Sequence, residues 1–172
     1  MTDPNTIAPQ PAGATGPAGV PGVMLLPSGD LVLTGGNNAV LKLMSAQGRP
    51  VDGAVATFWD NTAERARFCA MRGLAFSTWI FPDNLTVFAD DPAFAGLGVG
   101  SLYQRHCQTV QSAARAHVHY LGDVITAPDD FQQTDTHLSA MGMRSAVLAM
   151  ARSLDLPGQD AAFFRPVVRD DR

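Results

Sequence analysis

Residues 74–81 (LAFSTWIF) form an almost unbroken apolar run that ends at Pro82. A run of this length, closed by a proline, is typical of a strand that is buried on both faces of a parallel sheet. Such a strand constrains the fold strongly, because other elements must then cover both of its faces. The run therefore predicts an α/β domain.

Helical and extended patterns alternate on both sides of this run. Two apolar segments around the turn at residues 27–30 predict a β-hairpin, and Gly73 is the expected stop of a long helix. The predicted elements are strands 23–26 and 31–34, helices 39–46 and 56–72, strand 74–81, helix 102–115, strand 117–124 and helix 139–153. This order indicates a parallel sheet with helices packed on it.

The two ends of the chain differ from its middle. Residues 1–22 hold five Pro, four Gly and no aromatic or basic residue, so we expect a disordered segment that buries too little apolar surface to fold. Residues 163–168 (FFRPVV) look like the beginning of another strand. We therefore expect one α/β domain over residues 23–172, with a sheet that is incomplete at its C-terminal side.

Charge and composition exclude several classes of partner. The net charge is −4, and the basic residues are scattered singly, so no basic stripe is available for nucleic acid. No stretch approaches the ~20 apolar residues of a membrane span, and an acidic pI near 5.4 disfavours an anionic membrane surface. Cys69 and Cys107 are expected to be free, buried thiols. The first residues lack a secretory signal pattern, which predicts a cytoplasmic chain as written.

The candidate catalytic residues are Asp135 and His137, in the segment Asp135-Thr136-His137. In an extended segment, residues two apart project to the same side, so the two side chains can converge. A carboxylate that accepts a hydrogen bond from one imidazole nitrogen fixes the tautomer and leaves the other nitrogen as a base. The alternative is structural: Asp135 and Thr136 cap the following helix, and His137 is merely exposed.

Two further groups of polar side chains are interpreted without a catalytic or metal-binding role. His117 and His119 share a face of the expected strand and could supply two metal ligands, but no further ligand lies nearby. We interpret them as ordinary polar strand residues and expect no metal or cofactor. Asp129 and Asp130 are interpreted as solvated acids of a polar loop.

Four segments, in order, resemble the alginate O-acetyltransferase-like branch of the SGNH hydrolase superfamily. Together they span most of residues 23–155, and their order and spacing are more specific than any one of them. They are the hairpin motif 29–38 (GDLVLTGGNN), the Arg-bearing helix 65–72 with the apolar strand 76–81, the element 82–88 (PDNLTVF), and the element 133–138 (QTDTHL) with Gly142 five residues after His137.

This resemblance implies a three-layer SGNH or flavodoxin-like fold and a serine-dependent transfer of acetyl groups. It implies His137 as the general base and Asp135 as the residue that orients it. The chain departs from the family pattern at Asn84, where Lys is usual, and at Leu138, where Trp is usual. The family also carries a G-D-S block with the nucleophile after the D-x-H block, and none follows here.

No other residue is a convincing nucleophile. The closest match to G-D-S has Val124 in the serine position, and no G-x-S-x-G elbow occurs in the chain. Ser28 precedes the Gly-Asp pair of a hairpin turn, whereas Ser139 and Ser145 lie on the helix after His137. Cys107 lies beside His106, but adjacent helical residues face away from each other.

The sequence therefore predicts a partial SGNH-like carbohydrate O-acetyltransferase or esterase domain that is inactive alone. The alternative is a non-catalytic carbohydrate-binding protein or remnant of the same fold. The expected partner is a carbohydrate or acetylated substrate. A complementing chain that donates the serine, or self-association through an open sheet edge, is also expected. The enzymes that it resembles act in the periplasm, which leaves the compartment of a longer parent protein open.

Overall fold

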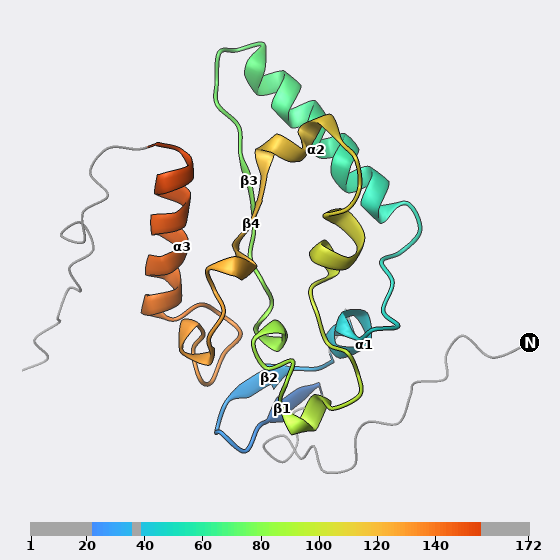
Figure 1. Ribbon diagram of the computed structural model, residues 1–172, viewed down its shortest axis with the longest axis vertical. Coiled ribbons are helices and arrows are strands. Elements are labelled where there is room, and N and C mark those ends of the chain that lie inside the picture. Colours follow the sequence, from blue (N-terminus) through green and yellow to red (C-terminus); the bar gives the residue numbers. More distant parts are fainter. Residues whose placement is uncertain (1–21, 36–38, 156–172) are drawn as a thin grey trace, which may run out of the picture.

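The computed structural model describes residues 22–35 and 39–155, and Figure 1 shows their path. The expected disordered segment, apart from Gly22, and the expected strand at 163–168 lie outside the described residues. The regular elements are β1 (Val23–Leu25), β2 (Leu31–Leu33), α1 (Val40–Met44), α2 (Ala54–Ala70), β3 (Thr78–Ile80), β4 (Val118–Tyr120) and α3 (Ala140–Ser153). A π-helical turn spans Tyr103–Cys107, and 3₁₀ turns span Asn84–Thr86, Pro92–Phe94, Ala113–His117, Leu121–Asp123 and Pro128–Asp130.

The predicted hairpin is confirmed. β1 and β2 pair antiparallel, with Val23 opposite Leu33 and Leu25 opposite Leu31. The turn between them places Gly29 at a φ of 91°, a left-handed conformation that glycine adopts without steric cost. The hairpin lies at one end of the molecule, below the second sheet (Figure 1).

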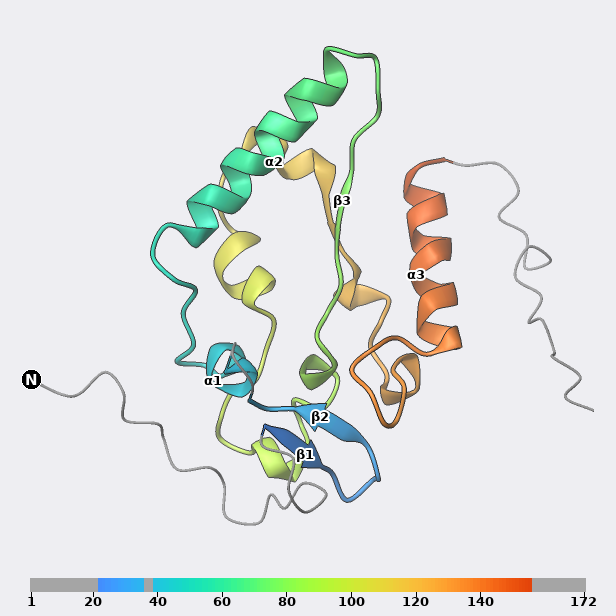
Figure 2. The ribbon, with the colours of Figure 1, turned by 180° about the vertical axis from the view of Figure 1, so that it is seen from behind.

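The second sheet is parallel and very short. β3 pairs with β4 in the register Thr78 to Val118, Trp79 to His119 and Ile80 to Tyr120. The views from both sides show this sheet running between α2 and α3 (Figures 1 and 2). The α/β class is thus confirmed in its coarse form, as a mixed structure with one small parallel and one small antiparallel sheet.

Strand burial differs from the sequence expectation. The residues of β3 are all only partly buried, and Leu74 and Phe81 are 57% and 42% exposed. Only Thr78–Ile80 keep ladder hydrogen bonds, because β4 offers three residues of parallel pairing and no other strand of the described residues joins this sheet. The prediction of a strand buried on both faces over 74–81 is therefore wrong.

Two apolar clusters hold the described part of the chain together. The first lies under the hairpin and contains Met24, Leu26, Val32, Met44, Leu85, Phe88 and Phe94. The second lies between α3 and the segment after β4 and contains Leu121, Ile125, Phe131 and Ala146, with Trp79 packed against it. The loop that holds Asp135 and His137 runs between Phe131 and the first turn of α3, so it is anchored at the second cluster.

The predicted helix at 102–115 is also wrong as a single helix. The chain forms a π-helical turn closed by the Gln108 N–H, which donates to the Tyr103 carbonyl at 2.8 Å. A separate 3₁₀ turn then begins after Ser112, whose side chain accepts from the Ala114 N–H. Within the π-helical turn, the Arg105 guanidinium donates to carbonyls of residues 43–45, about sixty positions earlier in the chain.

The remaining expectations concern single features. Cys69 and Cys107 are free, as predicted, but both are half-buried rather than buried. Among the described residues, no helix combines the length and the apolar character that crossing a membrane requires.

Candidate functional site

Asp135 and His137 lie in a closed loop that connects Phe131 with Leu138. These two end residues form an isolated antiparallel bridge. Inside it, the Gln132 N–H donates to the His137 carbonyl at 2.9 Å, and the Asp135 N–H donates to the Gln132 carbonyl at 3.2 Å. The loop is therefore a small structured unit that is closed by its own backbone hydrogen bonds.

The two candidate side chains meet as the spacing predicts. His137 Nδ1 lies 2.8 Å from Asp135 Oδ1. The same carboxylate oxygen accepts the Thr136 N–H at 2.6 Å. The hydrogen bond from His137 is the largest cause that holds the pKa of Asp135 below its ordinary value.

This contact determines what the imidazole can do. A proton on Nδ1, held by Asp135, leaves Nε2 as the acceptor nitrogen. Nε2 has no hydrogen-bond partner among residues 22–35 and 39–155, and the His137 side chain is 77% exposed. His137 is therefore free to take a proton from a group that approaches from solvent.

The helix-cap alternative is wrong. α3 is capped by Ser139, whose hydroxyl oxygen accepts the Gly142 N–H at 3.2 Å. The Ser139 hydroxyl also donates to the Asp129 carbonyl at 2.6 Å. Asp135 and Thr136 make no capping contact with the helix terminus, and the Asp135 carboxylate bonds within the loop instead.

The start of the loop is held by Asp130, which is only 7% exposed. Its carboxylate accepts the N–H groups of Thr126 and Ala127 at 2.9 and 3.0 Å. Its carbonyl accepts the Ser139 N–H at 2.8 Å. The interpretation of Asp130 as a solvated acid is therefore wrong. Asp130 is buried, and its hydrogen bonds join the start of the loop to the residue that caps α3.

Three of the four family-like segments converge in space at Leu31. The Leu31 N–H donates to the Gln133 carbonyl at 2.7 Å, and Asn84 Nδ2 donates to the Leu31 carbonyl at 3.2 Å. Gln133 Nε2 also reaches the Ser28 carbonyl, at 3.5 Å. The hairpin, the turn after β3 and the loop of Asp135 and His137 thus meet at the backbone of Leu31.

The candidate nucleophiles stay apart from this arrangement or are otherwise engaged. Ser28 donates its hydroxyl to Asp30 at 2.6 Å, and Ser139 is the helix cap. Val124, which takes the serine position in the closest match to G-D-S, offers no nucleophilic group; it follows a 3₁₀ turn and is 36% exposed. Burial raises the pKa of the Cys107 thiol, which disfavours the reactive thiolate.

The two histidines expected on one strand do not share it: His119 lies in β4, whereas His117 ends the preceding 3₁₀ turn. Both have structural partners. His117 Nδ1 lies 3.3 Å from the Phe76 carbonyl, and the His119 ring stacks on Trp79 with centroids 4.2 Å apart. No cluster of three or more His, Cys, Asp or Glu side chains in the described part of the chain is arranged to hold a metal ion.

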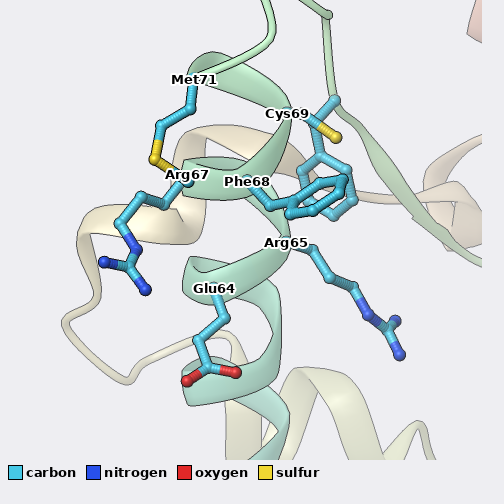
Figure 3. Close-up of a pocket in the computed structure, with 7 residues that line it drawn as sticks. Glu64, Arg65, Arg67, Phe68, Cys69 and Met71 are labelled. Carbon is cyan, nitrogen blue, oxygen red and sulfur yellow. The ribbon is translucent and has the colours of Figure 1, made fainter.

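One hollow in the described part of the chain lies away from the candidate site. It encloses about 440 Å³ along the C-terminal half of α2, where Figure 3 shows arginine and apolar side chains on neighbouring turns. It is lined by Glu64, Arg65, Arg67, Phe68, Cys69, Met71 and Phe76. Asp135 and His137 are presented on an exposed loop and line no part of it.

Sequence reasoning found the Asp135–His137 pair and missed the residues that hold it. The sequence marks Asn84 only as a departure from the family pattern, and no local signal in PDNLTVF points to its contact with Leu31. Comparison with protein-family models, curated proteins and solved structures finds no match for this chain.

Proposed function

We propose that this chain carries the base and the orienting carboxylate of a serine-dependent acyl-transfer site. In this proposal it is a partial SGNH-like carbohydrate O-acetyltransferase or esterase domain, inactive without a nucleophile from outside these 172 residues. The observation that carries the proposal is the 2.8 Å contact of His137 Nδ1 with Asp135, with Nε2 turned to solvent.

The chemistry assigns one role to each residue. A serine hydroxyl attacks the carbonyl carbon of a donor acetyl group while its proton passes to His137 Nε2. Asp135 stabilises the imidazolium that forms. The protonated His137 then gives its proton to the departing alkoxide, which leaves an acetyl-serine. Transfer of the acetyl group to a sugar hydroxyl, or to water, repeats the two proton movements with His137 again as base.

The proposed completion of the fold follows from the short parallel sheet. β3 and β4 share three paired residues on each strand, whereas a three-layer SGNH-type domain needs a wider parallel sheet. We infer that further strands, from a continuation of the chain, a complementing chain or a second copy, would pair with an open edge of this sheet. Those strands would bring the serine with them.

A non-catalytic role is the second candidate, and one observation favours it. Asp135 and His137 lie on an exposed loop, and neither lines the hollow along α2. A binding protein that keeps the sugar-facing surface of the fold would need no cleft at His137. Affinity for an acetylated polysaccharide that is unchanged by loss of both side chains would support this candidate.

We expect the purified chain to hydrolyse p-nitrophenyl acetate no faster than its D135A/H137A double variant. The physical reason is that a base without a nucleophile forms no acyl-enzyme and shows no burst phase. The measurement is the initial release of p-nitrophenol under multiple-turnover conditions. An acetyl group that accumulates on a serine or cysteine during turnover, and is lost in H137A, would show that the chain already holds the nucleophile.

A second measurement separates incompleteness from a non-catalytic role. Sequencing the encoding DNA beyond the codon for residue 172, in all three frames, should reveal a G-D-S-encoding segment or a neighbouring chain that carries one. If none is found, the fragment form of the proposal fails.

A further inference from the structure

Asn84 is a buried polar residue whose side chain is only half satisfied. Its exposed fraction is 1%. Nδ2 donates to the Leu31 carbonyl at 3.2 Å, and Oδ1 has no partner among the residues that the structure describes. A buried acceptor without a donor costs stability, so an apolar side chain of similar size would suit this position better on packing grounds alone.

Asn84 is itself held in a fixed place after β3. It opens the 3₁₀ turn Asn84–Thr86, which Asp83 caps by accepting the Leu85 N–H at 3.0 Å. The Thr86 hydroxyl donates to the Asp83 carbonyl at 2.6 Å. The amide of Asn84 therefore extends from a rigid turn at the carboxyl end of a parallel strand.

Leu31 connects this turn to the loop of Asp135 and His137. Its carbonyl accepts Asn84 Nδ2, and its N–H donates to the Gln133 carbonyl at 2.7 Å. Gln133 lies two residues before Asp135, inside a loop that the bridge of Phe131 with Leu138 closes. The two hydrogen bonds use the carbonyl and the N–H of Leu31. A displacement of the Asn84 side chain would therefore move the backbone of Leu31 and, through it, the loop.

We propose that Asn84 is a positioning residue for the Asp135–His137 pair, acting through the backbone of Leu31. This inference rests on the proposed function, because it gives Asn84 a role only if the pair is the base of a reaction. Asn84 sets the position of the loop relative to the carboxyl end of β3, which is the edge where open α/β sheets place their sites. The unpaired Oδ1 is the cost of that arrangement.

The test compares Asn84→Leu with Thr62→Val in the full chain. Thr62 is a matched control, because it is also buried and polar, and its hydroxyl bonds only the Phe58 carbonyl of its own helix. Carboxyl ¹³C NMR gives the pKa of Asp135, and urea unfolding gives the stability. We expect Asn84→Leu to raise the pKa of Asp135 toward its ordinary value, while Thr62→Val leaves it depressed.

Stability separates positioning from a purely structural role. Asn84→Leu removes one hydrogen bond and one unpaired acceptor, so its urea midpoint should fall no further than that of Thr62→Val. A pKa of Asp135 that stays depressed in Asn84→Leu overturns the inference. A rise in the pKa of Asp135 that Thr62→Val reproduces also overturns it, because such a rise would reflect a general loss of stability and not a change at the loop.

Two further results also decide the inference: a variant that does not fold, and an ordinary pKa of Asp135 in the unaltered chain. If Asn84→Leu does not fold, Asn84→Ala is read in the same way, since it removes the same amide without adding bulk. If the pKa of Asp135 is ordinary in the unaltered chain, no pair exists to be positioned, and the proposed function fails together with this inference. A depressed pKa in both the unaltered chain and the Asn84 variants defeats this inference alone.

Discussion

Gly142→Ala should strongly destabilise the domain, although alanine is the better helix former. A Cβ at residue 142 would lie 2.0 Å from the Asp130 carbonyl oxygen, which is a backbone atom with little freedom to move. The loop and the first turn of α3 would have to separate, losing the Ser139 bond to that carbonyl. Overpacking costs about 1–3 kcal/mol or more, and helix propensity returns about 1 kcal/mol.

We expect a net loss of about 2 kcal/mol in the free energy of unfolding, measured by urea denaturation. Gly100→Ala is the control, because a Cβ there meets nothing within 4 Å. It should change the free energy of unfolding by less than about 0.5 kcal/mol. Equal effects of the two substitutions would show that α3 does not pack against Asp130 as described.

Arg105→Ala should have an effect of similar or greater size, at the other end of the molecule. The Arg105 guanidinium donates to the carbonyls of Leu43 at 3.2 Å, Met44 at 2.8 Å and Gly100 at 3.0 Å, and also to Ser45. The carbonyls of the last turn of α1 have no partners within the helix. Burial and the charge of Arg49 lower the pKa of Arg105, so these acceptors are what stabilises its charge.

Hydrogen bonds to a charged group contribute about 1.5–3 kcal/mol each and are not additive, so we expect a total loss of about 3 kcal/mol. Arg105→Lys should recover only part of it, because an ammonium cannot reproduce the planar fork. Arg72→Ala is the matched control: its guanidinium lies 3.6 Å from the exposed Phe68 ring, which contributes about 0.5–1 kcal/mol. A thermal midpoint that falls no more in Arg105→Ala than in Arg72→Ala would contradict the role of Arg105.

The elements with strong local signals were predictable. The hairpin is defined by a Pro-Ser-Gly-Asp turn between two short apolar segments, and α2 and α3 lie close to their predicted ranges. These features depend on contacts between residues that are close in sequence. The 2.8 Å contact of Asp135 with His137 was predictable for the same reason, because a spacing of two in an extended loop allows the two side chains to meet on one side.

The features that were missed depend on distant partners. Arg105, in the π-helical turn Tyr103–Cys107, binds carbonyls about sixty residues away. The burial of Asp130 follows from the close approach of α3 at Gly142. Asn84 finds its partner 53 residues earlier, at Leu31. No local pattern encodes such pairs, so sequence reasoning could identify the Asp135–His137 pair but not the residues that support its loop.

The most direct test of the account is the tautomer of His137, measured by ¹⁵N NMR of the imidazole at neutral to slightly alkaline pH. We predict that the ring carries its proton on Nδ1 and not on Nε2, and that this preference is lost in Asp135→Ala. That state is the one in which His137 can accept a proton from a serine. A ring protonated on Nε2, or a tautomer unaffected by Asp135→Ala, would contradict the assignment of the pair as a base and its orienting carboxylate.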